Sequence, residues 1–418
     1  MSHASPPGAT RPPEPDGDDR RHRKRDVSLF VVSVLLPVPW VVADALGGLS
    51  WPPETFTPLA GLAILGGAFL LSWATELSER DIPQSLALLV LALISVLPEY
   101  AVDLHFAWTA GQDPSYAPYA VANMTGANRL LIGLGWASVV LVACWKGGTS
   151  HLEVAPGQRL ELRFLLLATL YSFLIPLGGE ISLLDAAVLL AIFAAYVAAA
   201  MRGDSHDTHM IGPAGMIDRE FGDVGRRVFA AALFLFAGYA IFASAEPFAD
   251  GLVELGRERH TDEFLLVQWV APLASESPEF LVAILFALRL RGSVGLGALF
   301  SSKVNQWTLL VGAIPIAFAI SSGGLHGLPL DARQSEELWL TSAQSLLAVI
   351  LIADMRFSRV EALALAVLFL GQLFCPETRV RWGFIAVYLA LSAALLAFGP
   401  WGRRGALRSL LGRDGGGP

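Results

Sequence analysis

The sequence is poor in charge, in lysine and in cysteine. Only 16% of its 418 residues are charged and 54% are hydrophobic, and the mean hydropathy is +0.55. This composition excludes a soluble enzyme and a disordered scaffold, and it is typical of an integral membrane protein. The only cysteines, Cys144 and Cys375, lie in apolar runs, which argues against a disulfide framework and a thiolate metal site. Lysine occurs only at Lys24, Lys146 and Lys303, and the last of these lies in an apolar region.

Long, continuous apolar runs make up most of the chain. A transmembrane β-barrel would show short segments of alternating hydrophobicity, so we expect helices as the spanning elements. Runs of about 17–25 apolar residues give about twelve such helices. No cleavable signal peptide is evident, so we expect the first apolar stretch to remain as a span. We expect contact with the lipid bilayer and with inorganic cations, and we predict no nucleic-acid or protein partner.

A short acidic stretch with prolines interrupts one of the apolar runs at residues 271–279. An ionisable group at membrane depth costs a few kcal/mol or more unless it faces a polar cavity, so Glu276 and Glu279 indicate a functional site. Pro278 removes a backbone donor and frees a carbonyl. In a bilayer this is tolerated only where protein or a water-filled cavity satisfies the exposed groups.

The same pattern occurs 180 residues earlier, in the stretch 95–99. The residues that are identical at this offset are Ser95/Ser275, Pro98/Pro278, Glu99/Glu279, Val102/Val282, Phe106/Phe286 and Ala107/Ala287. Four predicted helices separate the two Pro-Glu helices, which therefore run in opposite directions. Two proline-interrupted spans at corresponding positions of two halves indicate a transporter with a site near the membrane midplane.

This repeat predicts an all-α, polytopic membrane protein with two inverted five-helix repeats plus one extra helix at each end. The expected regions are a disordered cytosolic tail at 1–26, an extra N-terminal helix within 27–56, the first repeat at 57–201, a cytosolic linker at 202–227, the second repeat at 228–375, an extra C-terminal helix within 376–400 and a basic cytosolic tail at 401–418. Arginine is concentrated in alternate loops, which predicts that both termini are cytosolic. We expect the protein in a bacterial plasma membrane.

In each half, the Pro-Glu helix is followed by a span with small and amide residues, at 122–129 (Ala-Asn-Met-Thr-Gly-Ala-Asn-Arg) and at 297–306 (Gly-Ala-Leu-Phe-Ser-Ser-Lys-Val-Asn-Gln). Small residues let helices approach closely, and carboxylate, amide and hydroxyl oxygens suit Na⁺ and Ca²⁺. Over residues 57–375 the sequence resembles the sodium/calcium exchanger family of the cation/Ca²⁺ exchanger superfamily. The resemblance implies a secondary active antiporter, not an enzyme, which uses no cofactor. It implies exchange of Ca²⁺ or another cation against Na⁺ or H⁺ by alternating access.

The resemblance also implies which residues bind the ion. The matching positions are Glu99, Glu279, Asn123, Asn128, Ser95 and Ser275. The second repeat departs from the family pattern, because Ala298 stands at its first amide position and Ser301 replaces a glycine. Lys303 stands where an Asn or Asp would coordinate a cation, and Glu276 is an added carboxylate.

Lys303 leaves two roles open, since a protonated ammonium cannot be a metal ligand. It either neutralises Glu99, Glu279 or Glu276 in an ion pair, or loses its proton when a metal ion arrives, which would make it a proton-coupling group. Asp103 lies one turn after Glu99 on the same helix face. We expect it to line an outer vestibule or to have a structural role, solvated or paired with Arg129.

Three other functions stay open at this point. The substitution of lysine also fits a Na⁺/H⁺ antiporter in which Lys303 couples protons. An intramembrane hydrolase would use Ser301 or Ser302 with Lys303 as base, but neighbouring helix positions do not face each other. The remaining alternative is a transport-dead membrane scaffold that keeps the fold.

Overall fold

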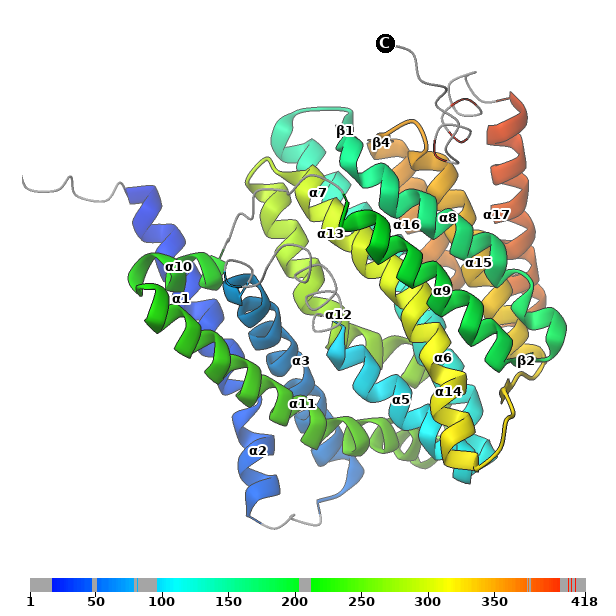
Figure 1. Ribbon diagram of the computed structural model, residues 1–418, viewed down its shortest axis with the longest axis horizontal. Coiled ribbons are helices and arrows are strands. Elements are labelled where there is room, and N and C mark those ends of the chain that lie inside the picture. Colours follow the sequence, from blue (N-terminus) through cyan, green and yellow to red (C-terminus); the bar gives the residue numbers. More distant parts are fainter. Residues whose placement is uncertain are drawn as a thin grey trace, which may run out of the picture.

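The chain folds into a bundle of long helices (Figure 1). The computed structural model describes residues 17–46, 51–78, 81, 96–202, 212–373, 375, 377–398, 405, 407 and 410. Ahead of the first repeat lie α1 (Gly17–Leu35) and α2 (Val38–Ala45). The helices of the first repeat are α3 (Pro53–Ser78), α5 (Leu97–Gln112), α6 (Ala117–Leu130), the π-helical η2 (Leu131–Trp136), α7 (Ala137–Gly147), α8 (Arg159–Ser172) and α9 (Leu183–Ala200).

A short helix, α10 (Gly212–Glu220), precedes the second repeat. The helices of that repeat are α11 (Asp223–Glu258), α12 (Glu263–Leu288), α13 (Gly292–Asn305), the π-helical η5 (Gln306–Leu310), α14 (Val311–Ser322), α15 (Ala332–Ile352) and α16 (Arg359–Leu373), and α17 (Thr378–Phe398) follows it. Short 3₁₀ turns occur at η1 (Pro114–Tyr116), η3 (Pro156–Gln158) and η4 (Ile175–Gly178). The third span of each repeat therefore has the same build, an α-helix interrupted by a π-helical segment, which is a feature frequently found at functional sites.

The π-helical segments lie at matching places in the two repeats. They begin at Leu131 and Gln306, which are 175 residues apart. The same offset relates Asn128 to Lys303 in the second motif. The repeat in the sequence is therefore also a repeat in the backbone.

Two small antiparallel sheets show that the repeats are inverted. On one face β1 (His151–Glu153), after the third span of the first repeat, pairs with β4 (Arg356–Ser358), after the fourth span of the second. On the other, β3 (Leu328–Pro329), after the third span of the second repeat, pairs with β2 (Glu180–Ile181), after the fourth span of the first. Figure 1 shows β1 and β4 at the top and β2 near the bottom. Exchanging the repeats exchanges the two faces, as an inverted pair requires.

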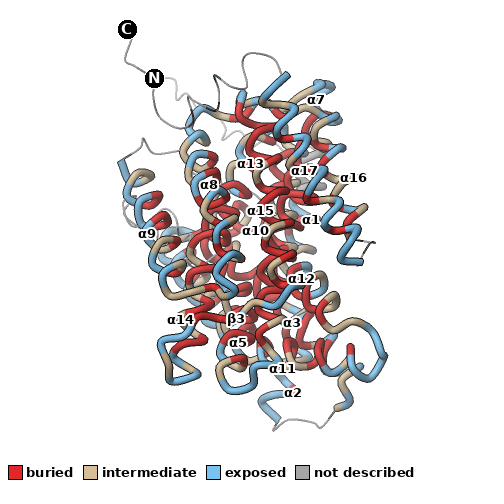
Figure 2. The backbone as a smooth tube through the Cα atoms, turned by 90° about the vertical axis from the view of Figure 1, so that its right-hand side faces the viewer, coloured by how far each residue is buried: buried red, intermediate tan, exposed pale blue. Residues whose placement is uncertain are grey.

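The exterior is apolar and the interior contains polar side chains, as in a membrane protein. Figure 2 shows buried residues along the middle of the bundle and exposed ones at its edge. Leu235 and Phe242 on α11 are exposed, whereas Asn128 and Gln344 are fully buried. Within the described ranges, nine helices are long and apolar enough to span a membrane. The first part of the predicted third span, residues 82–95, lies outside the described residues.

The first corrected boundary concerns the N-terminal tail. Residues 17–26 were predicted to be disordered, but they are helical, because α1 begins at Gly17. Arg23 on this helix is bonded to Glu220 on α10, at 2.7 Å. Asp26 is buried and accepts from the Arg25 guanidinium. These ion pairs stabilise a polar helical start that composition alone suggested was unstructured.

The second difference lies in the linker predicted at 202–227, which contains α10. Ala214 and Ile217 of this helix are buried in a cluster with Trp73 of α3. Four of the nine residues of α10 are Gly, Pro or Ala at its start, so its apolar face was too short to be recognised as a helix from the sequence.

Candidate ion-binding site

The two Pro-Glu helices contain their prolines in different ways. α5 begins at Leu97, so Pro98 lies in its first turn, where a missing N–H costs nothing. Glu99 lies in the same turn, near the positive end of the helix dipole. α12 instead continues as one helix through Pro278. Glu99 is 1% exposed, and the Glu279 carboxyl is close enough to interact with it electrostatically.

Several carboxylate oxygens in this region are free to bind. Both oxygens of Glu99, and one each of Glu276 and Glu279, are buried and have no hydrogen-bond partner among the described residues. A buried polar group without a partner costs about 1–3 kcal/mol, and a charged one costs more. A hard cation or protons would remove this cost, since carboxylate oxygens are ligands that such cations prefer.

The first repeat adds a buried hydrogen-bonded pair beside Glu99. The Asn123 amide donates to Asp103 at 2.9 Å, and Asp103 is 0% exposed. Asp103 was predicted to line an outer vestibule or to have a structural role, either solvated or paired with Arg129. It is instead buried and bonded to Asn123, because α5 packs tightly against α6 and α14. The equivalent residues of the second repeat are Ala283 and Ala298, so this pair has no counterpart there.

The second repeat has a different pair. The Gln306 amide donates to Glu276 at 3.0 Å, and both residues are fully buried. The equivalent positions of the first repeat hold Val96 and Leu131. Gln306 was not identified from the sequence. Its place at the start of a π-helical segment was the signal that could have indicated it.

Lys303 lies between the two repeats and is 0% exposed. Its Nζ donates to Oδ1 of Asn128 at 2.6 Å and to the Asn128 carbonyl at 3.1 Å. The ammonium also lies 4.5 Å from the centroid of the Trp307 ring. Glu276 interacts with Lys303 electrostatically, but the two hydrogen bonds of the ammonium go to an amide rather than to one of the carboxylates considered from the sequence.

The neutral ligands that were predicted are largely engaged in other bonds. The Asn128 amide donates to the Met124 carbonyl at 2.8 Å, while its oxygen accepts from the buried ammonium. The Ser275 hydroxyl donates to the Ala271 carbonyl at 3.3 Å. Ser95 lies outside the described residues. Among the described residues, the buried oxygens without a partner therefore include those of the carboxylates and the amide oxygens of Asn123, Gln268 and Gln306.

A glycine lets the second span of the first repeat approach the Pro-Glu helix of the second. A Cβ atom at Gly126 of α6 would lie 1.9 Å from the carbonyl oxygen of Gln268 on α12. Any side chain at Gly126 would therefore push these helices apart. The close contact holds Asn123 and Asn128 of α6 beside α12, as the small residues of the motif led us to expect.

A second buried network adjoins the site and was missed in the sequence. Arg129, next to Asn128, pairs with Glu337 of α15 at 2.5 Å. Glu337 also binds Arg381 of α17, and Gln344 donates to the Arg129 carbonyl at 3.0 Å. The network joins the extra C-terminal helix to the site helix α6. Only the acidic residues within an apolar run were a signal for it.

Comparison with known proteins agrees with this architecture. The family model described as sodium/calcium exchanger protein matches residues 55–202 and 229–375. The crystal structure of the H⁺/Ca²⁺ exchanger CAX is 45% identical, covers 93% of this chain and 98% of its own, and superposes with a TM-score of 0.86. Comparison with curated sequences gives no match.

Two more distant structures share the fold. Native YfkE is 14% identical, with a TM-score of 0.62 over 86% of this chain and 99% of its own. The sodium-calcium exchanger NCX_Mj, soaked with Na⁺ and Sr²⁺, is 19% identical, with a TM-score of 0.51 over 76% of this chain and 96% of its own. With both repeats matched and a relative of high identity over nearly the full length, this chain belongs to the sodium/calcium exchanger family.

Proposed function

We propose that this protein exchanges Ca²⁺ against protons by alternating access. The observation that carries the proposal is the bond between Lys303 and Asn128, which occupies two positions where neutral oxygens would otherwise face the ion. A sodium ion needs several oxygen ligands, whereas a proton needs only one. The carboxylates that remain, Glu99 and Glu279, suit a divalent cation and can each carry a proton.

The charges of the site explain how the two ions would be coupled. One Ca²⁺ offsets the charges of Glu99 and Glu279, and so do two protons. A site with both carboxylates ionised and empty is costly to enclose in a low-dielectric interior. The enclosed intermediate therefore forms with Ca²⁺ or with protons, but not empty, and this requirement couples the two fluxes.

Lys303 acts in this proposal as a fixed positive charge. It lies next to the site, so it disfavours any further cation beyond the one that the carboxylates offset. Its bond to Asn128 joins the equivalent spans of the two repeats, which would keep it in place as the helices around it move. The relative with 45% identity is the H⁺/Ca²⁺ exchanger CAX, which supports exchange of the same two ions by this chain.

The other functions have less support. Na⁺/H⁺ antiport requires that Na⁺ replace Ca²⁺ at the carboxylates, and no contact favours it. For a hydrolase, Lys303 would have to activate a neighbouring serine. The hydroxyl of Ser301 instead lies 3.1 Å from Tyr196 Oη, and the lysine ammonium is bonded to Asn128.

Flux measurements in proteoliposomes test the proposal. We expect an imposed pH gradient to drive ⁴⁵Ca²⁺ uptake, with no further stimulation by a Na⁺ gradient, and we expect liposomes with Glu99→Gln to show none. Calcium uptake driven by Na⁺ without a pH gradient would contradict the proton as counter-ion. Proton movement driven by Na⁺ with no Ca²⁺ flux would support the Na⁺/H⁺ alternative instead.

A further inference from the structure

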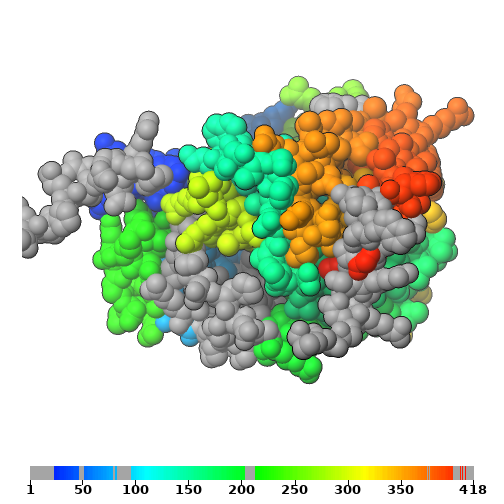
Figure 3. Space-filling model, turned by 90° about the horizontal axis from the view of Figure 1, so that it is seen from above, coloured from blue at the N-terminus to red at the C-terminus, as the bar shows by residue number. Residues whose placement is uncertain are grey.

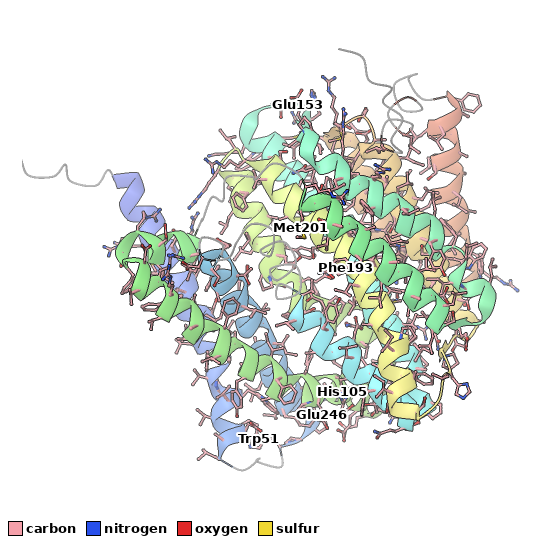
Figure 4. The ribbon with its side chains drawn as sticks, viewed as in Figure 1. Trp51, His105, Glu153, Phe193, Met201 and Glu246 are labelled. Carbon is pink, nitrogen blue, oxygen red and sulfur yellow. The ribbon has the colours of Figure 1, made fainter. Side chains whose placement is uncertain are left out.

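A cavity lies at the end of the bundle that we predict to be cytosolic, away from the ion-binding site. Its volume is about 480 Å³, and it is enclosed by the end of α7, by β1 and by the loop from α12 to α13. Glu153 of β1 is labelled at this end in Figure 4. Seen from above, the segment around β1 and that loop lie side by side (Figure 3).

The cavity walls have an apolar part and a polar part. Ala143, Leu152 and Leu290 form the apolar part. The polar part contains hydrogen-bond donors and an arginine: Thr149, His151, Arg291 and Ser293. Hydroxyl, imidazole and guanidinium groups together are the donors that bind phosphate oxygens. An apolar wall beside such donors suits a molecule that has both a phosphate and a hydrocarbon part.

Positive charge at this place exceeds negative charge. Neither Arg289 nor Arg291 forms an ion pair with a carboxylate of the described residues. The pKa of Arg289 is lowered, mainly by burial and also by the neighbouring charges of Arg25, Arg219 and Arg291. The charge of Asp26 acts in the opposite direction. Asp26 is already bonded to Arg25 at 3.1 Å. Among the described residues, Arg289 and Arg291 therefore have no carboxylate of their own.

Glu153 is the one carboxylate in the cavity wall among the described residues, and two basic side chains lie near it. Arg356 lies 3.7 Å from it and His151 lies 3.9 Å from it. The positive charge of Arg356 therefore reduces the repulsion between Glu153 and an anion. Arg291 has no carboxylate partner within the described part of the chain. The side of the cavity at the α12–α13 loop is therefore positively charged, whereas basic side chains offset the charge of Glu153 on the side at β1.

The loop also has the features of a membrane-interface segment. Leu290, between Arg289 and Arg291, is 65% exposed and has a φ of 60°, which is uncommon for a leucine. Trp145, at the end of α7, is 73% exposed. Tryptophan at helix ends is typical of the lipid headgroup level, and arginine at the cytosolic face attracts anionic lipids.

We propose that this cavity binds the phosphate of an anionic phospholipid headgroup from the adjoining leaflet. Arg291 binds the phosphate, Thr149 and Ser293 border it, and the acyl chains extend over Leu290 toward the bilayer. Arg289, in the same loop but outside the cavity wall, adds positive charge. The proposal concerns a lipid site of its own and does not depend on which ions the protein exchanges. Inorganic phosphate shares the binding chemistry but lacks the hydrocarbon part.

Thermal unfolding of the purified full-length protein in a neutral detergent tests the site. Phosphatidylglycerol should raise the midpoint temperature by about 3 °C or more, relative to the same amount of phosphatidylcholine. The Arg289→Gln/Arg291→Gln double variant should lose at least half of that rise. Arg359→Gln, which removes an exposed arginine outside the cavity wall at the same end of the bundle, should keep it.

Native mass spectrometry provides a second readout that does not depend on the stability of the variant. Wild-type protein should retain phosphatidylglycerol over phosphatidylcholine, and Arg291→Lys, which keeps the charge but not the forked donor, should retain several-fold less. Equal retention in the double variant and in wild type would overturn the site. An equal thermal shift with millimolar inorganic phosphate would overturn the assignment to a lipid.

Discussion

The two repeats share a backbone plan but differ in the polar residues that it positions. In the first, Asp103 and Asn123 form a buried pair. In the second, Glu276 and Gln306 form one at other positions. Each pair lies where the opposite repeat has apolar residues. An inverted repeat therefore fixes where helices bend and meet, while substitutions at equivalent positions decide what the site can bind from each side.

The prolines show the same difference at the level of the backbone. Pro98 lies in the first turn of α5, whereas Pro278 lies within the continuous helix α12. Glu99 thus gains the field of a helix start, and Glu279 does not. The two glutamates, although equivalent in sequence, lie in unequal surroundings. The following predictions test whether that inequality matters for transport.

The largest effect should come from the acidic pair that the repeats have in common. Glu99→Gln and Glu279→Gln should each abolish Ca²⁺ flux, because each removes charge that offsets ion dehydration, while an amide is cheaper to bury. Flux in proteoliposomes measures this, with insertion checked by size-exclusion chromatography. Near-normal flux in only one variant would show that the repeats contribute unequally even at these positions.

The next largest effect should be on stability, in the network that joins α6 to the C-terminal helix. Glu337→Gln should lower the free energy of unfolding by about 3–5 kcal/mol, because it leaves Arg129 and Arg381 buried without their shared carboxylate. Chemical denaturation in detergent measures it. Glu54→Gln, which breaks an exposed pair with Arg259, should cost about 1 kcal/mol or less. A similar, small cost for both variants would contradict a structural role for the network.

The sequence predicted the inverted repeats that surround the site, but it predicted few of the contacts between the side chains of the site. The shared Pro-Glu pattern predicted the inverted repeats, because an offset that recurs in charged and proline positions has few other causes. It did not identify the partner of Lys303, since hydrogen bonds between distant spans leave no local pattern. The equivalence of positions 128 and 303 was visible, however, and residues close to the axis of an inverted repeat can meet each other.

The burial of Asp103 could not be predicted for a similar reason. Its position one turn after Glu99 was clear, but its exposure depends on α14, which packs against α5 from the other repeat. The pair of Arg129 and Glu337 likewise joins segments 208 residues apart. Local periodicity gives the helices, whereas such pairings depend on the three-dimensional packing of both repeats.

A smaller but more specific effect should follow from making the second repeat like the first at position 303. Lys303→Asn removes a positive charge and frees Oδ1 of Asn128, so it should bind Ca²⁺ or Na⁺ about tenfold more tightly. Transport should keep its pH dependence, because Glu99 and Glu279 still carry the protons. Lys303→Met removes the charge without supplying a ligand. The difference in affinity between the two variants therefore separates the effect of the lost charge from the effect of the added ligand. Isothermal titration and flux across pH 6–9 measure both, and a pH dependence that disappears in Lys303→Asn would show that Lys303 couples protons instead of acting as a fixed charge.

A moderate effect should come from making the first repeat like the second. Asp103→Ala and Asn123→Ala introduce the residues found at positions 283 and 298. A double-mutant cycle should give a coupling energy of about 1–2 kcal/mol in the free energy of unfolding, because each residue is the other's buried partner. Additive single effects would show that the hydrogen bond contributes nothing beyond packing.

The smallest effect concerns an ion pair between the repeats outside the membrane. The hydrogen bond from Arg226 holds the pKa of Asp81 below its usual value. A lowered pKa in the folded state stabilises the protein above the unfolded pKa, near 4, and this stabilisation is lost as pH falls through the folded pKa. Asp81→Asn should therefore cost about 1 kcal/mol at pH 7 and progressively less as the pH falls below about 4. A cost that does not change with pH would contradict this origin.

The most direct test of the account is the number of protons released when Ca²⁺ binds to the purified protein. In weakly buffered detergent solution, Ca²⁺ should displace about two protons, because Glu99 and Glu279 carry them in its absence. The Glu99→Gln/Glu279→Gln variant should release none. Excess Na⁺ should leave the Ca²⁺ affinity unchanged. Binding of Ca²⁺ with no proton release and with strong competition from Na⁺ would contradict the exchange of Ca²⁺ against protons at this site.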